Sequence, residues 1–286
     1  MNIHHEWRSV NGIRLHCAVA GSGPLLILLH GFPEFWYSWR HQIPVLAEHF
    51  TVVAPDLRGY NESDKPPRIA DYSVPVLVED VIQLIRSFDQ ERAIIAGHDW
   101  GGLVAWATAL SRPDLVEKLI ALNIPHPRLF VQHVLTNPRQ MVRSWYMLFF
   151  QLPWLPEATI RANNYRMIDG AFRGMAVHKE QFPAEVIAEY KRAIAKPGAL
   201  TSALNYYRAM MRGGTLGFTA DLDPVARMPV MVVWGEQDTA LGKELNDRLR
   251  HYVPQLTLHF IPDASHWVQQ DRPDLVNGYM LDFLLG

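Results

Sequence analysis

Three residues whose types can supply a nucleophile, an acid and a base each follow a run of apolar residues. Asp99 follows the run 92–96, and Asp238 and His266 come shortly after the runs that end at Trp234 and Ile261. Ligands bind beyond the carboxyl ends of strands in open α/β sheets. The order nucleophile, acid, histidine is also the order of a catalytic triad on such a sheet. We therefore expect these three side chains to meet at one edge of a sheet.

Asp99 is the central residue of a Gly-x-Asp-x-Gly motif (97–101), which has the spacing of a nucleophile elbow. Glycine permits the sharp turn that such an elbow needs. A carboxylate that attacks saturated carbon forms an ester that water can cleave, whereas serine would form a stable ether. Aspartate therefore indicates substitution at saturated carbon. On the motif alone, an aspartate that caps the following helix is the alternative, and the matching positions of Asp238 and His266 favour the triad.

A second glycine-containing turn runs from His30 to Pro33. Gly31 gives conformational freedom and Pro33 fixes the chain direction, so the Phe32 N–H is expected to point at the site. Together with the N–H of Trp100, it would stabilise an oxyanion. We predict a cis peptide bond between Phe32 and Pro33. An ordinary strand–helix loop is the alternative interpretation.

The elements that position these residues alternate between strand and helix, which predicts a mostly parallel sheet with helices on both faces. Asn11 and Gly12 join two alternating runs and predict a type I′ hairpin. Strands are predicted at 3–10, 13–20, 25–29, 51–54, 92–96, 118–122, 229–234 and 256–261, and helices at 78–85, 105–110, 243–252 and 274–285.

Between Asn123 and Pro224 the strands stop, and proline-punctuated helical stretches take their place. This change predicts an all-helical insertion in an α/β core. The core is expected at 1–123 and 225–286, and the cap at 124–224. Within the cap, helices are predicted at 138–151, 157–168, 184–195 and 199–211.

Composition narrows the function classes. With 27 basic and 29 acidic residues among 286, the chain has no electrostatic footprint for nucleic acid. Its single cysteine, Cys17, excludes an internal disulfide framework and a cysteine metal cluster. No apolar run is long enough to span a bilayer, and the first residues do not resemble a signal peptide. We expect a soluble, cytoplasmic protein without a nucleic-acid or membrane partner, present as a monomer or homodimer.

Over nearly its whole length the chain resembles the epoxide hydrolases of α/β-hydrolase fold. The resemblance rests on motifs at 30–33, 56–60, 97–102, 235–238 and 266–267. The first four also occur in haloalkane dehalogenases. The chain departs from the family at Asn61, where glycine is usual, and asparagine tolerates a positive φ.

The resemblance also implies two cap tyrosines that hold and protonate the epoxide oxygen. Tyr207 matches one of them, in the stretch Asn-Tyr-Tyr-Arg (205–208), and Tyr146 matches the other, before an aromatic stretch containing Gln151 and Pro153. Their helical spacing alone favours burial in a core. An alkoxide is a poor leaving group, however, so opening the epoxide ring needs a nearby acid. A phenol can donate that proton, which favours a catalytic role for the two tyrosines.

The expected reaction converts a small-molecule epoxide and water to a vicinal diol through an ester on Asp99, without a metal or an organic cofactor. His266, oriented by Asp238, would activate the water. Residues near the motifs are expected to form the oxyanion site and the pocket walls, namely Phe32, Trp100, His30, Pro33, Trp36 and Trp267.

A haloalkane dehalogenase with the same nucleophile is the alternative function. It would hold the halide with two N–H donors, Trp100 and either Trp145 or Trp154. A fluoroacetate dehalogenase is less favoured, because an arginine is expected where Trp100 stands. The intact triad disfavours a catalytically silent binding protein, and Asp99 excludes a serine esterase.

Overall fold

The strands of the chain form one sheet in the order β1-β2-β4-β3-β5-β6-β7-β8. β1 pairs with β2 and β2 with β4 in antiparallel fashion, and the other neighbours pair in parallel. The mostly parallel sheet is therefore confirmed. The computed structural model describes residues 2–212 and 222–286, with strands β1 (His4–Val10), β2 (Ile13–Ala20), β3 (Leu25–Leu29), β4 (Thr51–Pro55), β5 (Ala93–His98), β6 (Val116–Leu122), β7 (Val230–Gly235) and β8 (Leu256–Ile261).

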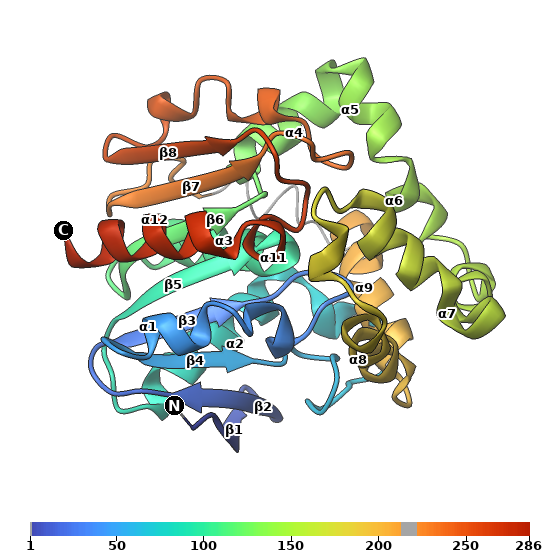
Figure 1. Cartoon of the computed structure of the whole chain (residues 1–286), viewed down its shortest axis with the longest axis horizontal. Coiled ribbons are helices and arrows are strands. Elements are labelled where there is room, and N and C mark those ends of the chain that lie inside the picture. The colour runs from blue at the N-terminus through green and yellow to red at the C-terminus, as the bar shows by residue number, and fades with distance from the viewer. Residues whose placement is uncertain (1, 213–221) are drawn as a thin grey trace.

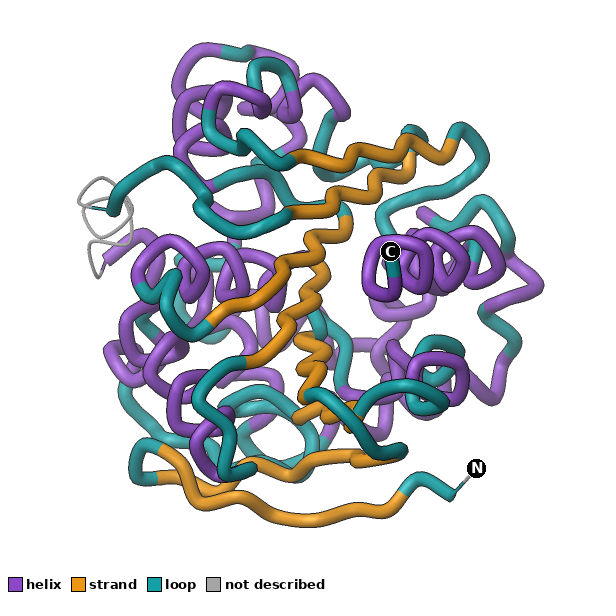
Figure 2. Tube along the Cα trace, turned by 90° about the vertical axis from the view of Figure 1, so that its left-hand side faces the viewer, coloured by secondary structure: helices purple, strands orange, loops and turns teal. Residues whose placement is uncertain are grey.

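Helices cover both faces of this sheet, so that the strands run through the middle of the molecule (Figure 2). Side chains of α2 and α3 pack on one face, and side chains of α1 and α12 pack on the other. β3 and β5 are buried at every residue, which suits their continuous apolar sequences. The core helices are α1 (Ile43–Leu46), α2 (Val74–Ser87), α3 (Asp99–Ser111), α11 (Val268–Asp271) and α12 (Pro273–Leu285).

Two turns follow the sequence closely. Asn11 and Gly12 both have positive φ, 45° and 76°, which confirms a hairpin turn of the predicted kind between β1 and β2. Asn61 also has a positive φ, 37°, so asparagine takes the conformation expected where the family has glycine. The helix predicted at 243–252 is wrong. Two short 3₁₀ turns replace it, because Arg248 adopts a left-handed φ of 66° between them.

A helical insertion separates β6 from β7, as predicted, and lies beyond the carboxyl ends of the strands (Figure 1). The predicted helix 138–151 divides into α5 and α6 at Ser144, and α7 contains a non-helical stretch at 162–165. α4 was not predicted, although proline is well tolerated at its first position. The inserted helices are α4 (Pro127–Thr136), α5 (Pro138–Arg143), α6 (Trp145–Phe149), α7 (Leu155–Met175), α8 (Ala184–Ala195) and α9 (Ala199–Arg212).

Residues 213–221 of the predicted cap lie outside the described residues. In the described part of the chain, none of the helices has both the length and the apolar character needed to cross a bilayer.

Candidate active site

Asp99 occupies a tight turn between β5 and α3 with a positive φ of 49°. A non-glycine residue rarely adopts this conformation, so the surrounding structure must hold it there. Gly97 and Gly101, on either side of Asp99, permit the neighbouring backbone segments to approach closely. A Cβ on Gly97 would overlap the Gly101 carbonyl, and a Cβ on Gly101 would overlap the carbonyl of Leu29. The elbow therefore lifts the Asp99 carboxylate above the sheet edge.

The structure brings the three predicted triad residues together. His266 Nδ1 lies 2.7 Å from Asp238 Oδ2, and His266 Nε2 lies 3.6 Å from Asp99 Oδ2. All three residues are buried. The backbone N–H groups of Ala240 and Leu241 donate to Asp238 Oδ1, which fixes the orientation of that carboxylate. His266 can therefore exchange a proton with a water beside Asp99 while Asp238 holds its ring.

The two carboxylates control the charge of the histidine. Burial alone would lower the pKa of His266, but the charges and hydrogen bonds of Asp238 and Asp99 raise it well above its ordinary value. Burial likewise opposes ionisation of Asp99, but His266 outweighs it and lowers the pKa of that carboxyl. Without substrate, the site therefore favours an ionised Asp99 beside a protonated His266.

One carboxylate oxygen of Asp99 already has a backbone donor. The Phe32 N–H donates to Asp99 Oδ1 over 2.8 Å, and the predicted cis bond between Phe32 and Pro33 is confirmed. Trp100 is the second residue of α3, so its N–H has no acceptor within the helix. The Phe32 N–H comes from the loop after β3 and the Trp100 N–H from the first turn of α3, and these are the two donors expected to form an oxyanion site.

Tyr146 and Tyr207 line the same cavity as Asp99 and His266. Their ring centroids lie 5.8 Å apart at 82°, and Tyr207 also packs against the ring of Phe32. Burial, followed by the charge of Asp99, raises the pKa of each phenol, so both hydroxyls stay protonated. They are therefore available as hydrogen-bond donors to an oxygen atom in the cavity.

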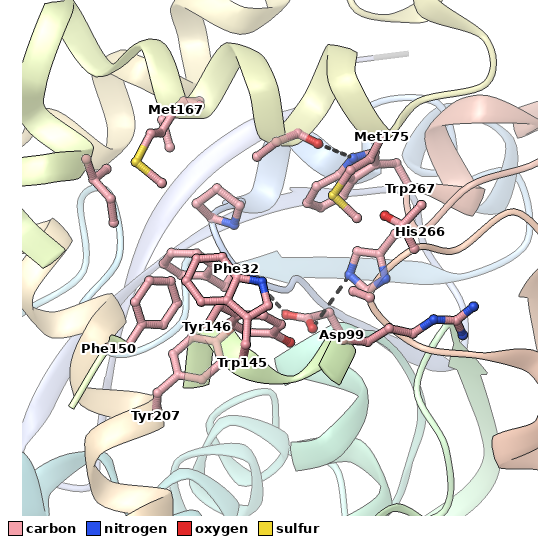
Figure 3. A pocket seen from close by; sticks show the side chains of 17 residues that line it. Phe32, Asp99, Trp145, Tyr146, Phe150, Met167, Met175, Tyr207, His266 and Trp267 are labelled. Carbon is pink, nitrogen blue, oxygen red and sulfur yellow. Dashed lines mark hydrogen bonds and ion pairs between the residues drawn. The ribbon is translucent and has the colours of Figure 1, made fainter. Parts of the chain in front are cut away.

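The cavity has a volume of about 280 Å³ and separates the phenols from the histidine. Tyr146, Tyr207 and Phe150 gather on one side of Asp99, and His266 and Trp267 lie on the other (Figure 3). Of the predicted pocket walls, Phe32, Pro33 and Trp267 line it. Trp145, which the dehalogenase alternative named as a candidate donor, also lines it, whereas Trp154 does not. Further lining residues that sequence reasoning missed include Arg143, Phe150, Ile160, Met167 and Met175.

Three predicted pocket residues lie elsewhere. His30 is buried beneath the loop, where its Nε2 accepts the Leu57 N–H, so it supports the turn from behind. The Trp36 ring packs against His5 near the N-terminal hairpin, away from the cavity. Trp100 lines a smaller neighbouring cavity, which shares Asp99 and both tyrosines with the main one. Spacing along the chain cannot show which side of a loop a ring occupies.

A buried pair behind the site was not predicted. Glu34 accepts hydrogen bonds from Gly31 N–H and His98 Nδ1, each over 2.8 Å, and from Gln270 Nε2. His98 Nε2 donates to the carbonyl of His266 over 2.8 Å. A carbonyl oxygen only accepts, so His98 Nε2 must carry a proton. The contact between His98 Nδ1 and Glu34 then holds one further proton, which the two residues share. The pair ties the elbow to the loop that carries His266.

Within residues 2–212 and 222–286, the structure has no cluster of three or more histidine, cysteine or acidic side chains arranged to hold a metal ion.

Comparisons with known proteins identify the family of this fold. The model of the α/β hydrolase fold family matches residues 24–273. The chain is 44% identical to the AB hydrolase superfamily protein YfhM of Bacillus subtilis, over 98% of this chain and 97% of that protein. It is 37% identical to human epoxide hydrolase 4, over 96% of this chain and 76% of that protein.

A crystal structure of an epoxide hydrolase from Bacillus megaterium has a TM-score of 0.91 to this structure. The two chains are 34% identical, and the match covers 98% of this chain and 100% of that one. That crystal holds an inhibitor, and a variant of the same enzyme has been crystallised with its product, (R)-3-[1]naphthyloxy-propane-1,2-diol.

Proposed function

The chain belongs to the α/β-hydrolase-fold family and is closely related to the epoxide hydrolases, and from this premise we propose that it hydrolyses an epoxide to a vicinal diol. One observation supports this proposal above the others. The Asp99 carboxylate and the protonated phenols of Tyr146 and Tyr207 border one apolar cavity. A nucleophile for carbon and a pair of donors for oxygen are what opening an epoxide ring requires.

In the first step, Asp99 attacks the less hindered carbon of the epoxide. Oδ1 accepts the Phe32 N–H, so Oδ2 is the oxygen free to form the new bond to carbon. The carbon–oxygen bond of the ring breaks, and its electrons go to the ring oxygen. The two phenols hydrogen-bond this oxygen and supply its proton. The product is a β-hydroxyalkyl ester on Asp99.

In the second step, His266 takes a proton from water, and the hydroxide attacks Cγ of the ester. Formation of the ester removes the negative charge of Asp99, which had raised the pKa of His266. After the first step the imidazolium therefore loses its proton to solvent, while the phenolate formed in that step regains one from solvent, and the neutral imidazole is then the base. The Phe32 and Trp100 N–H groups stabilise the tetrahedral oxyanion. The bond from Cγ to Oδ2 then breaks as His266 returns a proton to Oδ2, and the diol leaves with an oxygen from Asp99 in its second hydroxyl.

The cavity favours an epoxide with one bulky apolar substituent. Its walls combine aromatic rings such as Phe150 and Trp267 with the flexible side chains of Met167 and Met175. An aryl glycidyl ether has this form, and the diol crystallised with the Bacillus megaterium enzyme is the product of such an ether. We propose this class of substrate for the present chain.

Product analysis tests the function directly. The purified protein is incubated with phenyl glycidyl ether, and the diol is quantified by chromatography and mass spectrometry. We expect diol formation that Asp99→Ala abolishes. A parallel incubation with a bromoalkane measures halide release, which the dehalogenase alternative predicts. Halide release without diol formation would replace the proposed function with that alternative.

A further inference from the structure

The inserted helices expose a continuous series of large apolar side chains. Val142 and Trp154 are each 72% exposed, Leu148 is 64% and Trp145 is 60%. Single exposed apolar residues are normal, but a cluster of this size marks a surface that contacts something apolar. We call this surface the α5–α6 edge and define it by Met141, Val142, Trp145, Leu148, Leu152, Trp154, Leu155 and Met211.

The α5–α6 edge is continuous with the proposed active-site cavity. Trp145 belongs to both, because its ring is largely exposed and also lines the cavity. Its ring centroid lies 6.0 Å from that of Phe149, which packs in turn against Phe150 in the cavity wall. α5, α6 and the start of α7 lie together at one side of the molecule (Figure 1). Apolar side chains therefore run from the outside of the cap to the wall of the cavity.

The same surface carries positive charge. The stretch 124–156 contains three arginines and no aspartate or glutamate. Arg139 on α5, Arg161 on α7 and Arg212 at the end of α9 are all exposed. The next acidic residue, Glu157, is buried and paired with Arg208. Arg143 is partly neutralised, at 3.6 Å from Glu244. Exposed tryptophan and leucine are thus flanked by cations.

We propose that the α5–α6 edge binds the surface of an anionic phospholipid bilayer. Tryptophan and leucine insert at the boundary between headgroups and acyl chains, while arginine binds the lipid phosphates. A second copy of this chain fits less well. A two-fold interface places the same cationic surface on both partners, where like charges repel. An anionic bilayer supplies both the apolar layer and the opposite charge.

Binding in this orientation places Trp145, which borders the cavity, against the lipid. An apolar epoxide dissolved in the bilayer then reaches Asp99 along apolar surface, and the more polar diol leaves into water. This proposal departs from the expectation, drawn from composition, of a protein without a membrane partner. Bilayer binding is measured without substrate, so its failure would leave the proposed hydrolase activity untouched.

Vesicle sedimentation of the full chain tests the proposal. We expect binding to vesicles of phosphatidylcholine mixed with phosphatidylglycerol, and at least about ten-fold weaker binding to phosphatidylcholine alone. The double variant Leu148→Ser/Trp154→Ser should lose roughly ten-fold or more of the binding to the mixed vesicles. Neither side chain lines the cavity, so hydrolysis of a water-soluble epoxide should persist and show that the variant is folded.

Two further variants make the test specific. The double variant Trp7→Ser/Phe260→Ser removes two apolar side chains of the sheet, which are 52% and 38% exposed and lie outside the inserted helices. It should bind vesicles as strongly as the unchanged protein. Arg139→Gln/Arg161→Gln should weaken binding to the anionic vesicles only. Absence of binding, or equal binding by the Leu148/Trp154 variant, would overturn the proposal. So would a dimer in solution that this variant abolishes, because the edge would then cover a second copy.

Discussion

At the scale of single residues, the proposed mechanism depends on the way in which Asp99 and His266 control each other's protonation. His266 is buried between two carboxylates, and their combined charge outweighs the cost of burying an imidazolium. An ester on Asp99 removes one of those charges. The same contact therefore keeps the histidine protonated before the first step and releases it as a base for the second.

Asp99→Asn imitates the charge of the ester and should lower the pKa of His266. The remaining carboxylate of Asp238 still raises this pKa, while burial still lowers it. Titration of the imidazole resonances by NMR in both proteins measures the difference. In the variant, His266 should lose its proton at lower pH. In the unchanged protein, hydrolysis of the ester on Asp99, which is also uncharged, should accelerate as pH rises through the pKa of His266 measured in the variant. An unchanged titration would show that Asp99 does not control the histidine.

His266→Gln should stop the reaction after the first step, because no base remains to activate water. Intact-protein mass spectrometry after mixing with an epoxide should show one added substrate mass. Asp99→Ala is the control and should show no added mass under the same conditions. An adduct on the Asp99→Ala protein would place the covalent bond on another residue.

Tyr146→Phe and Tyr207→Phe should each lower kcat for epoxide opening by about 10²-fold, because each removes one donor to the ring oxygen. Single-turnover measurement of ester formation separates this step from hydrolysis of the ester. Tyr72→Phe is a matched control, since its hydroxyl binds Pro66 and Ser202 rather than the cavity. Equal rates for all three variants would remove the tyrosines from the mechanism.

At the scale of elements, a buried ion pair holds the cap helices that carry the tyrosines. Arg208 follows Tyr207 on α9 and donates to both carboxylate oxygens of Glu157 on α7. It also donates to the carbonyls of Phe150 and Leu152, which both follow α6. One guanidinium thus fixes three cap segments around the cavity.

Glu157→Ala should lower the free energy of unfolding by about 2–4 kcal/mol, because it leaves Arg208 buried without its carboxylate partner. Urea denaturation monitored by tryptophan fluorescence measures the change. Glu185→Ala, at an exposed position of α8, is the control and should change stability by less than about 0.5 kcal/mol. Similar values for the two variants would show that the pair does not stabilise the cap.

At the scale of the whole molecule, the positions of the strands along the chain could be predicted, because buried parallel strands are continuous apolar runs. Each predicted strand corresponds to an observed strand. Helix ends in the cap were less predictable, since the break at Ser144 and the kink at 162–165 depend on packing. The residues expected to form the triad could be found because each follows such a strand.

Features that depend on which way a side chain faces could not be predicted. Trp36 is close to the motifs in sequence but packs on the other side of its loop. The pair of Glu34 and His98 becomes visible only when three loops meet. The α5–α6 edge is also a property of the folded chain, because the same apolar residues would serve equally well in a core.

The proposed reaction depends on a covalent bond between the Asp99 carboxylate and carbon, which a single turnover in ¹⁸O-labelled water detects. With enzyme in excess over epoxide, we expect an unlabelled diol from the first turnover and one heavy oxygen in the Asp99 carboxyl group. Peptide mass spectrometry locates that label. A diol labelled by solvent in the first turnover, with Asp99 unlabelled, would show that water attacks the epoxide without a covalent intermediate.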